Sequence, residues 1–302
     1  MKLSPSLALS TAFFYALGYP IGALAVRAAT PGIVLLSRFV ASAVILGFIA
    51  AALRLEWPRG KFAGHAAVVG VLTQGVQFVG CYQAMRLGVS PVLVALIIAM
   101  NPVLTAALAT RALGERLDSR RVASVVLAVL AIGAAFAGRL LDVGRIDAAV
   151  LWVVLAVFGL AGGGIHQQRY LTTGHPVASN AIGIAAAIVP AGFFALLTEQ
   201  EVTNAPQAVW TVVVLVLANS VVAATLYIAA IKQAGAAAVS LLFGIIPSMA
   251  ALLSWAIMGE RPDLGVVAGL VLGAAACFLG IRRRGAGSTP VESAGGEVAA
   301  RA

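Results

Sequence analysis

One long segment of this sequence occurs twice. Residues Gly114–Arg116 read Gly-Glu-Arg, and residues Gly259–Arg261 repeat them 145 positions later, each followed two residues on by an aspartate. A gapless alignment that contains both copies gives 16 identities in 55 positions. Each copy follows an apolar run with a proline near its middle, Pro102 or Pro247, and precedes another apolar run. The repeat predicts two related structural units, which constrains the architecture more than any other feature.

The apolar runs indicate an all-α polytopic membrane protein. Hydrophobic residues make up 61% of the 302 residues and charged residues only 10%, whereas a soluble domain carries about 25% charged residues. A bilayer core of about 30 Å is crossed by about 20 apolar residues in a helix. We predict ten transmembrane helices, at approximately residues 7–26, 32–53, 65–85, 91–110, 119–137, 148–168, 177–197, 208–231, 236–258 and 264–281.

The basic residues between the spans predict the orientation. With the N-terminus in the cytoplasm, the cytoplasmic segments hold 13 Lys and Arg residues and the outer loops hold 5. The positive-inside rule therefore places both termini in the cytoplasm. Because five helices is an odd number, the two copies then form inverted five-helix repeats, residues 5–137 and 147–282. The tail, residues 285–302, is rich in Gly, Ser and Ala, and we expect it to be disordered.

The same composition excludes other partners and cofactors. The net charge of +9 lies between apolar runs and acts on topology, so we expect no nucleic-acid partner. Cys81 and Cys277 both lie within apolar runs, and we expect buried thiols with no disulfide, no metal and no cofactor. The first span ends in Ala-Leu-Ala, as a cleaved signal peptide does, but it has a counterpart in the second copy, so we expect it to be retained.

Amides within the third and eighth spans are candidate substrate-cavity residues. Gln74 and Gln77 lie three residues apart, which predicts that they share one helix face. The 145-residue offset pairs Gln74 with Asn219, and Tyr82 with Tyr227. Polar groups inside spans mark cavities or helix contacts. We predict a polar girdle around a central cavity; amide hydrogen bonds between helices are the alternative.

Three further polar residues are candidates for the same cavity. Arg38 lies about seven residues into the second span, where it could hold a substrate carboxylate through a bidentate fork. The alternatives are that it reaches to the outer interface or pairs with backbone carbonyls. Asn101 precedes Pro102 at the centre of the fourth span, and Tyr19 lies within the first span.

Prolines and glycines at corresponding positions are candidate gates or hinges. Pro102 and Pro247 each predict a kink with a freed carbonyl at membrane depth, with plain curvature as the alternative. Gly18 matches Gly163 across the repeat, and Pro20 adds a second weak point to the first span. A hinge is one interpretation and close helix packing is the other. His166 lies at the cytoplasmic end of the sixth span. Its imidazole could form part of an inner gate, carry a proton or face the lipid headgroups.

Taken together, these features resemble a known family. Two five-helix halves, each with a central proline in its penultimate helix, a Leu-Gly-Glu-Arg or Met-Gly-Glu-Arg turn and a final helix rich in small residues, resemble the drug/metabolite transporter superfamily. Within it they resemble the EamA-type exporters. The resemblance implies the ten-helix fold and a role in transport. General likeness, without a specific motif, points to the bacterial aromatic amino-acid exporters.

We therefore expect a secondary transporter in the bacterial plasma membrane, not an enzyme. It would export small amphipathic metabolites by alternating access, with aromatic or other apolar amino acids as the expected substrates. A multidrug or other metabolite transporter of the same fold is the alternative. An intramembrane enzyme is disfavoured because no His-Glu-x-x-His motif and no acidic pair lies within a span. The absence of Asp and Glu from the spans favours facilitated or weakly coupled export. A monomer in the lipid bilayer suffices for this geometrically, because the two repeats supply their own pseudo-dimer; a homo-oligomer is the alternative.

Overall fold

The fold of the described residues is entirely helical. The computed structural model describes residues 3–112 and 148–259, with isolated positions between 119 and 130 and between 264 and 275. The predicted fifth and tenth spans, the first Gly-Glu-Arg turn and the tail therefore fall wholly or largely outside the described residues. In chain order the elements are α1 (Pro5–Ala28), α2 (Pro31–Ala52), α3 (Lys61–Gly70), η1 (Val71–Val76), α4 (Gln77–Arg86), α5 (Pro91–Ile98), α6 (Asn101–Ala112), α8 (Ala148–Tyr170), α9 (Pro176–Leu197), α10 (Ala205–Val214), η2 (Leu215–Ala223), α11 (Ala224–Ala234), α12 (Ala236–Ser240), η3 (Leu241–Gly244) and α13 (Ile246–Met258).

Six helices in these ranges are long and apolar enough to cross a membrane. Four are α1, α2, α8 and α9. The third and eighth predicted spans each join three elements, α3–η1–α4 over Lys61–Arg86 and α10–η2–α11 over Ala205–Ala234. The ninth predicted span consists of two helical pieces, Ala236–Gly244 and Ile246–Met258, which are bent by 41°. The described residues thus confirm a multi-span helical protein, and the total of ten spans stays a prediction.

The fourth and ninth spans are each interrupted next to the proline for which the sequence predicted a kink. Pro102 is the second residue of α6, and the chain before it closes a tight turn in which the Met100 N–H donates to the Ile97 carbonyl at 2.9 Å. Pro247 occupies the same place in α13. Proline has no N–H, and its ring disfavours a helical conformation in the residue before it. The helix therefore ends and a new one starts with proline in its first turn, where the missing donor costs little.

The 145-residue offset carries over to the helix boundaries. Adding 145 to the bounds of α2 (Pro31–Ala52) gives the bounds of α9 (Pro176–Leu197). The third span of each half contains a π-helical stretch at the same place, η1 and η2, which the sequence did not predict. Such wide turns interrupt the regular helix spacing and turn side chains away from their expected face. The duplication is therefore structural, including its irregular parts.

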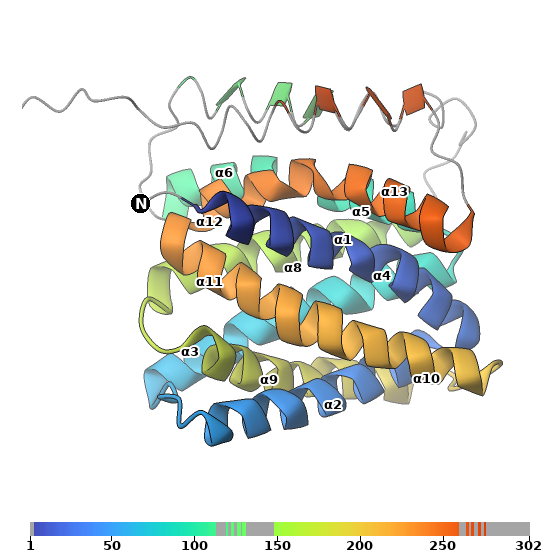
Figure 1. Ribbon diagram of the computed structural model, residues 1–302, viewed down its shortest axis with the longest axis horizontal. Helices are drawn as coiled ribbons and strands as arrows, with labels where there is room; N and C mark the ends of the chain where they lie inside the picture. Colours follow the sequence, from blue (N-terminus) through green and yellow to red (C-terminus); the bar gives the residue numbers. More distant parts are fainter. Residues whose placement is uncertain are drawn as a thin grey trace, which may run out of the picture.

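The two halves pack into each other. Helix α1 of the first half packs against α10, η2, α11 and α13 of the second half, and α8 of the second half packs against the corresponding elements α3, η1, α4 and α6. Helices α2 and α9 lie side by side in extensive contact (Figure 1). Each first helix therefore completes the opposite half, and the interior of the molecule lies between the repeats.

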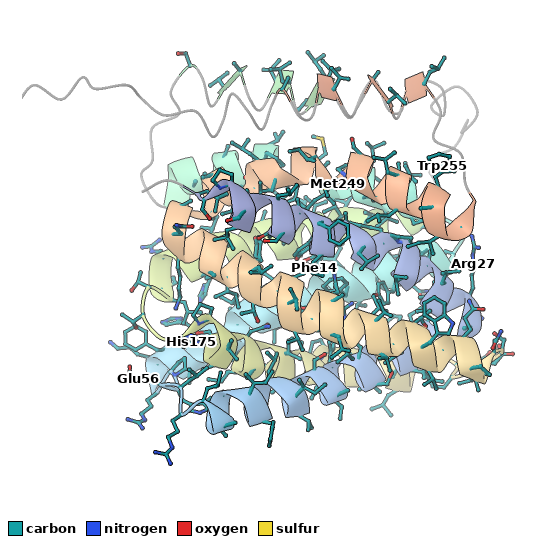
Figure 2. All side chains as sticks on the ribbon, in the orientation of Figure 1. Phe14, Arg27, Glu56, His175, Met249 and Trp255 are labelled. Atoms are coloured by element: carbon teal, nitrogen blue, oxygen red, sulfur yellow. The ribbon has the colours of Figure 1, made fainter. Side chains whose placement is uncertain are left out.

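Several polar side chains within the spans are buried, and many large apolar side chains are exposed, as a lipid environment requires. Arg38, Gln77 and Asn219 are buried, whereas Phe48 is 74% and Leu196 86% exposed. Figure 2 shows His175 at one end of the helices and Arg27 at the opposite end. Large apolar side chains exposed along several helices would be an association surface in water, but in a bilayer they face lipid.

Candidate functional site

The most unusual residue of the interior is Arg38 on α2, whose side chain is fully buried. Its Nε donates to the Ser220 Oγ at 2.7 Å, its Nη1 to the Tyr82 Oη at 2.8 Å and its Nη2 to the Asn219 Oδ1 at 2.5 Å. The guanidinium carbon also lies 4.0 Å from the centre of the Phe78 ring. The interpretation that Arg38 reaches to the membrane interface is therefore wrong, and its partners are side chains instead of backbone carbonyls.

All three acceptors of the Arg38 guanidinium are neutral. The carboxylates among the described residues, Glu56, Glu199 and Glu201, lie in loops between helices. Burying a charge without a counter-ion is costly unless hydrogen bonds and dipoles compensate for it. Three hydrogen bonds and an aromatic face supply that compensation. They also leave two of the five N–H groups of the guanidinium for another acceptor.

A narrow pocket lies beside this cluster. It is lined by aromatic and small side chains from α1 and α4, and its interior has room for about one water molecule. The Tyr19 hydroxyl is buried in it without a hydrogen-bond partner among the described residues. We call it the Arg38 pocket because it shares Tyr82 and Phe78 with the surroundings of Arg38, although Arg38 itself does not line it. Its lining residues are Tyr15, Gly18, Tyr19, Gln77, Phe78, Cys81, Tyr82 and Met85.

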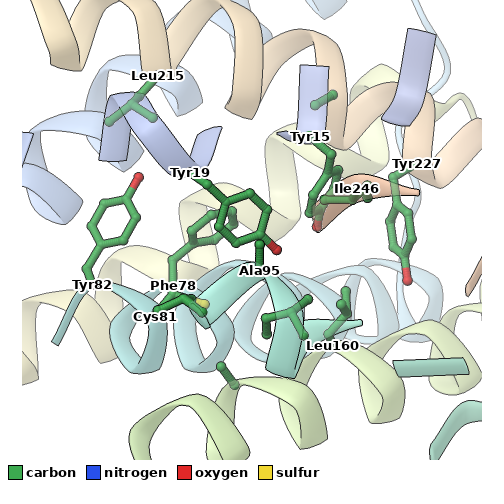
Figure 3. Close-up of a cluster of buried hydrophobic side chains, with 14 of the residues drawn as sticks. Tyr15, Tyr19, Phe78, Cys81, Tyr82, Ala95, Leu160, Leu215, Tyr227 and Ile246 are labelled. Atoms are coloured by element: carbon green, nitrogen blue, oxygen red, sulfur yellow. The ribbon is translucent and has the colours of Figure 1, made fainter. Parts of the chain in front are cut away.

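Tyrosines from both halves meet between the helices (Figure 3). The Tyr15 ring lies 5.8 Å from the Tyr227 ring and 5.2 Å from the Phe243 ring, centre to centre. The Tyr15 hydroxyl donates to the Gln77 Oε1 at 3.4 Å. The interior surface next to Arg38 is therefore aromatic with a few polar tips, which suits an amphipathic molecule.

A second narrow pocket lies between α3–η1, α9 and α11. It contains two buried polar atoms without a partner among the described residues, Gln74 Oε1 and Ser179 Oγ. Tyr227 and Gly183 also line it, and we call it the Gly183 pocket. Helices α3 and α9 cross so closely here that a Cβ on Gly70 would overlap the backbone of Gly183.

The candidates Gln74 and Gln77 do not act as one face. Gln77 lines the Arg38 pocket and Gln74 lines the Gly183 pocket. The π-helical turn of η1 ends between them, so the α-helical spacing assumed from the sequence does not hold there. Tyr82 and Tyr227 are separated in the same way, one in each pocket, whereas Arg38 and Asn219 are in direct contact.

The other cavity and hinge candidates have local packing partners. Asn101, at the start of α6, accepts a hydrogen bond from Thr105 at 3.0 Å and lines neither pocket. A Cβ on Gly18 would overlap the Asn219 amide, and one on Gly163 would overlap Thr73. Both glycines thus allow close contact with the opposite half, which is the packing alternative. One more candidate, Pro20, is buried within α1.

The candidate gate residue His166 on α8 has a partner that the sequence did not indicate. The His166 Nε2 lies 3.1 Å from the His65 Nδ1 of α3, and the Tyr170 ring stacks on His65 with centres 4.6 Å apart. Both imidazoles are half-buried near the end of the molecule at which α3 begins. The pair joins the two halves at that end.

Sequence reasoning missed Ser220, Ser179 and Tyr15. Serine occurs throughout apolar helices and carries no signal by itself, although Ser220 directly follows the candidate Asn219. Tyr15 lies one helical turn before the candidate Tyr19, which is a signal that could have found it. Ser179 and Gln74 line the same pocket because α3 and α9 cross there. No feature of the sequence pattern indicates this crossing.

Comparison with known proteins agrees with this architecture. The family model described as "EamA-like transporter family" matches the chain twice, over residues 3–136 and 147–282. A solved structure described as "Crystal structure of protein" is 17% identical with a TM-score of 0.69, over 91% of this chain and 96% of that one. At this identity the likeness concerns the fold alone. A search among curated proteins finds no match.

The two family matches together span most of the chain, and each corresponds to one copy of the repeat. The helical halves, the apolar exterior and the polar interior between the halves are the features of a membrane transporter. The chain belongs to the EamA-like transporter family and is a multi-pass membrane transporter of the drug/metabolite type.

Proposed function

We propose that this protein exports small amphipathic carboxylates, with aromatic or other apolar amino acids as its substrates. It would do so as a secondary transporter, by alternating access between two inverted five-helix repeats. We further propose that the protein has ten spans and lies in the bacterial plasma membrane. Its termini would be cytoplasmic, as the distribution of basic residues indicates. A monomer suffices, because the two repeats supply both sides of the path.

The observation that carries this proposal is the neutral environment of Arg38. Its guanidinium is held by Tyr82 of the first half and by Asn219 and Ser220 of the second, and no carboxylate among the described residues neutralises it. A substrate carboxylate would supply the missing counter-charge through a charge-assisted, bidentate contact. The aromatic side chains beside it would contact the apolar side chain of the substrate, once the pocket widens beyond its present room for about one water molecule.

Flux from loaded proteoliposomes tests the proposal with a matched pair of substrates. L-Phenylalanine and phenylethylamine share a ring, a chain and an amino group, and only phenylalanine has a carboxylate. We expect efflux of phenylalanine to exceed that of phenylethylamine by at least about tenfold, the value of one charge-assisted hydrogen bond. Empty liposomes and liposomes loaded with benzoate provide the background and a carboxylate without an amino group.

Two outcomes would contradict the proposal. Equal efflux of phenylalanine and phenylethylamine would remove the role of the carboxylate. Efflux of cationic dyes without efflux of any amino acid would favour the multidrug alternative. The same assay with and without a pH gradient tests coupling: because no Asp or Glu lies within a predicted span, we expect efflux to continue without the gradient.

A further inference from the structure

The Gly183 pocket occupies the place that the repeat assigns to the Arg38 side chain. Subtracting 145 from Gly183 gives Arg38, so one half carries a buried guanidinium where the other has no side chain. The helices around the two positions also correspond, because α2 packs on η2 as α9 packs on η1. The pocket is therefore the counterpart of the Arg38 cluster without its tethered cation.

The hydrogen-bonding groups around the two positions are of the same three kinds. Arg38 is held by a phenol, an amide and a hydroxyl: Tyr82, Asn219 and Ser220. The Gly183 pocket is lined by the same kinds of group: the phenol of Tyr227, the amide of Gln74 and the hydroxyl of Ser179. Asn180 and Thr73 also line it, but their side chains are hydrogen-bonded to Thr225 and to the Val69 carbonyl. The phenols and the amides correspond across the 145-residue offset, whereas the serine comes from a different position.

Two of these groups have no partner of their own. Gln74 is 5% exposed and Ser179 is 2% exposed, and neither Gln74 Oε1 nor Ser179 Oγ is hydrogen-bonded within the described residues. An unsatisfied buried polar atom costs about 1–3 kcal/mol. Native proteins rarely keep such atoms unless a ligand, an ion or a water uses them. The pocket thus offers acceptors that the chain itself does not use.

We propose that the Gly183 pocket is a second binding site, specific for a primary ammonium group. An ammonium head has three N–H donors and no acceptor, which matches the phenol, amide and hydroxyl oxygens. The pocket has room for about one water-sized group, so a compact head fits better than a guanidinium. The Arg38 cluster demonstrates that neutral oxygens suffice to hold a cation in this interior.

This site is distinct from the carboxylate site of the proposed function and does not depend on it. The two pockets share no lining residue, and each contains one member of the Tyr15–Tyr227 pair. The ammonium group could belong to a transported amine or be a free small ammonium ion. Both sources share the same chemistry, and a series of amines separates them.

The test is equilibrium binding of radiolabelled methylamine to the full chain purified in detergent. Competition by ammonium chloride and n-butylamine separates a free ion from an amine with an apolar tail, and n-butanol is the neutral control. The variants are Ser179→Ala and the double variant Gln74→Leu with Ser179→Ala. The matched control is Ser254→Ala, since Ser254 is also a buried serine without a partner but lines neither pocket.

We expect ammonium chloride to compete and n-butanol not to compete. Competition by n-butylamine in addition would assign the ammonium group to an amine whose tail lies outside the pocket, and its absence would assign it to a free ion. Each lost hydrogen bond to the charged group should weaken binding about tenfold, so the double variant should lose binding by about 100-fold. Ser254→Ala should bind as the wild type does. Competition by n-butanol equal to that of n-butylamine, no methylamine binding at all, or full binding by Ser179→Ala would overturn the proposal. Because this is a binding assay, these results leave the transport of carboxylates an open and separate question.

Discussion

The two ends of the molecule are closed by corresponding segments with different chemistry. At the Arg27 end, the corner between α1 and α2 pairs through its backbone with the loop between α9 and α10. The Thr30 N–H donates to the Glu201 carbonyl at 3.0 Å, and the Thr203 N–H donates to the Ala28 carbonyl at 2.9 Å. We call this pairing the Ala29 junction, after the residue that forms an isolated β-bridge with Val202.

The opposite end lacks this backbone pairing within the described residues. There the corner between α8 and α9 is bonded by a side chain, because the Lys232 ammonium donates to the Thr173 carbonyl at 2.9 Å and to the Gly174 carbonyl. The Pro58 ring lies against Gly174. We call these contacts the Gly174 junction.

The sequence contains the physical cause of the difference. The counterpart of Thr203 is Pro58, which has no N–H to donate. The counterpart of Ala29 is Gly174, which has φ +85° instead of the extended φ of −152° that pairs with a strand. The two repeats therefore have corresponding helices but different loops, so that backbone hydrogen bonds join the segments at one end and the Lys232 side chain joins them at the other. We expect the Gly174 end to open more easily.

The prediction with the largest expected effect concerns the close crossing of α3 and α9, which connects the two halves of the molecule. Gly70→Leu would place a side chain in the backbone of Gly183, and neither backbone can move without separating α3 from α9. Such overpacking should destabilise the protein by about 3 kcal/mol or more. We expect no monodisperse peak in size-exclusion chromatography. The control is Gly64→Leu in the same helix, where a Cβ meets nothing within 4 Å; a normal peak for Gly70→Leu would show that the crossing is not tight.

The second prediction separates binding from stability at Arg38. Arg38→Met removes a buried cation but leaves its three acceptors without that donor, and because these two effects oppose each other we expect little change in the melting temperature. Efflux of phenylalanine should fall about 100-fold, because a bidentate charge-assisted contact is lost. Arg38→Lys keeps the positive charge but cannot make the bidentate contact, so its phenylalanine efflux should lie between that of the wild type and that of Arg38→Met. Normal efflux with a lower melting temperature would make Arg38 a structural residue.

How much of this was predictable from the sequence depends on the range of the interactions. For the eight predicted spans that lie within the described residues, the repeat register and the apolar runs predicted the positions to within a few residues, and the helix boundaries of α2 and α9 follow the register. The separation of Gln74 from Gln77 was not predictable, because nothing in the local residues indicates a π-helical turn. Pro102 and Pro247 marked the right positions, but whether a helix bends or breaks there depends on how the neighbouring helices pack.

The site shows the same limit. The register paired Gln74 with Asn219, which are amides at equivalent places in the two halves. It did not predict that Asn219 would be bonded to Arg38 while Gln74 Oε1 has no partner. That contrast depends on what lies opposite each amide, Arg38 or Gly183, and the pairing of α2 with η2 and of α9 with η1 is a tertiary contact. Composition and residue spacing describe one chain segment at a time, so they do not predict which helices pack against each other.

The third prediction exchanges the residues at two equivalent loop positions, Thr203 at the Arg27 end and Pro58 at the opposite end. Thr203→Pro removes the N–H that donates to the Ala28 carbonyl and the hydroxyl that donates to the Arg27 and Ala28 carbonyls. Because Thr203 is exposed and water competes for these bonds, the Ala29 junction should weaken by about 1 kcal/mol. Cys81 lines the Arg38 pocket and reports opening at that end. In a Cys277→Ala background, we expect an impermeant maleimide added at the Arg27 end to label Cys81 about fivefold faster. The reverse variant, Pro58→Thr, should not accelerate labelling; acceleration by both variants would indicate general loosening instead of a gate.

The smallest effect is expected at the Gly174 junction. Lys232→Met removes two hydrogen bonds to carbonyls, but the ammonium group is partly exposed and water competes for it, so the loss should be only about 0.5 kcal/mol. Labelling of Ser179→Cys from the His175 end should therefore rise about twofold, with Lys61→Met, an exposed lysine at the same end, as the control.

The direction of this change matters more than its size. If the two ends belong to one equilibrium, opening the Gly174 junction must close the Ala29 junction, because a bias toward one state lowers the population of the other. Lys232→Met should then slow the labelling of Cys81 from the Arg27 end, because the population gained by the state open at the Gly174 end is lost by the state open at the Arg27 end. Independent breathing of each end would leave the Cys81 rate unchanged, and alternating access between the halves would then lose its structural basis.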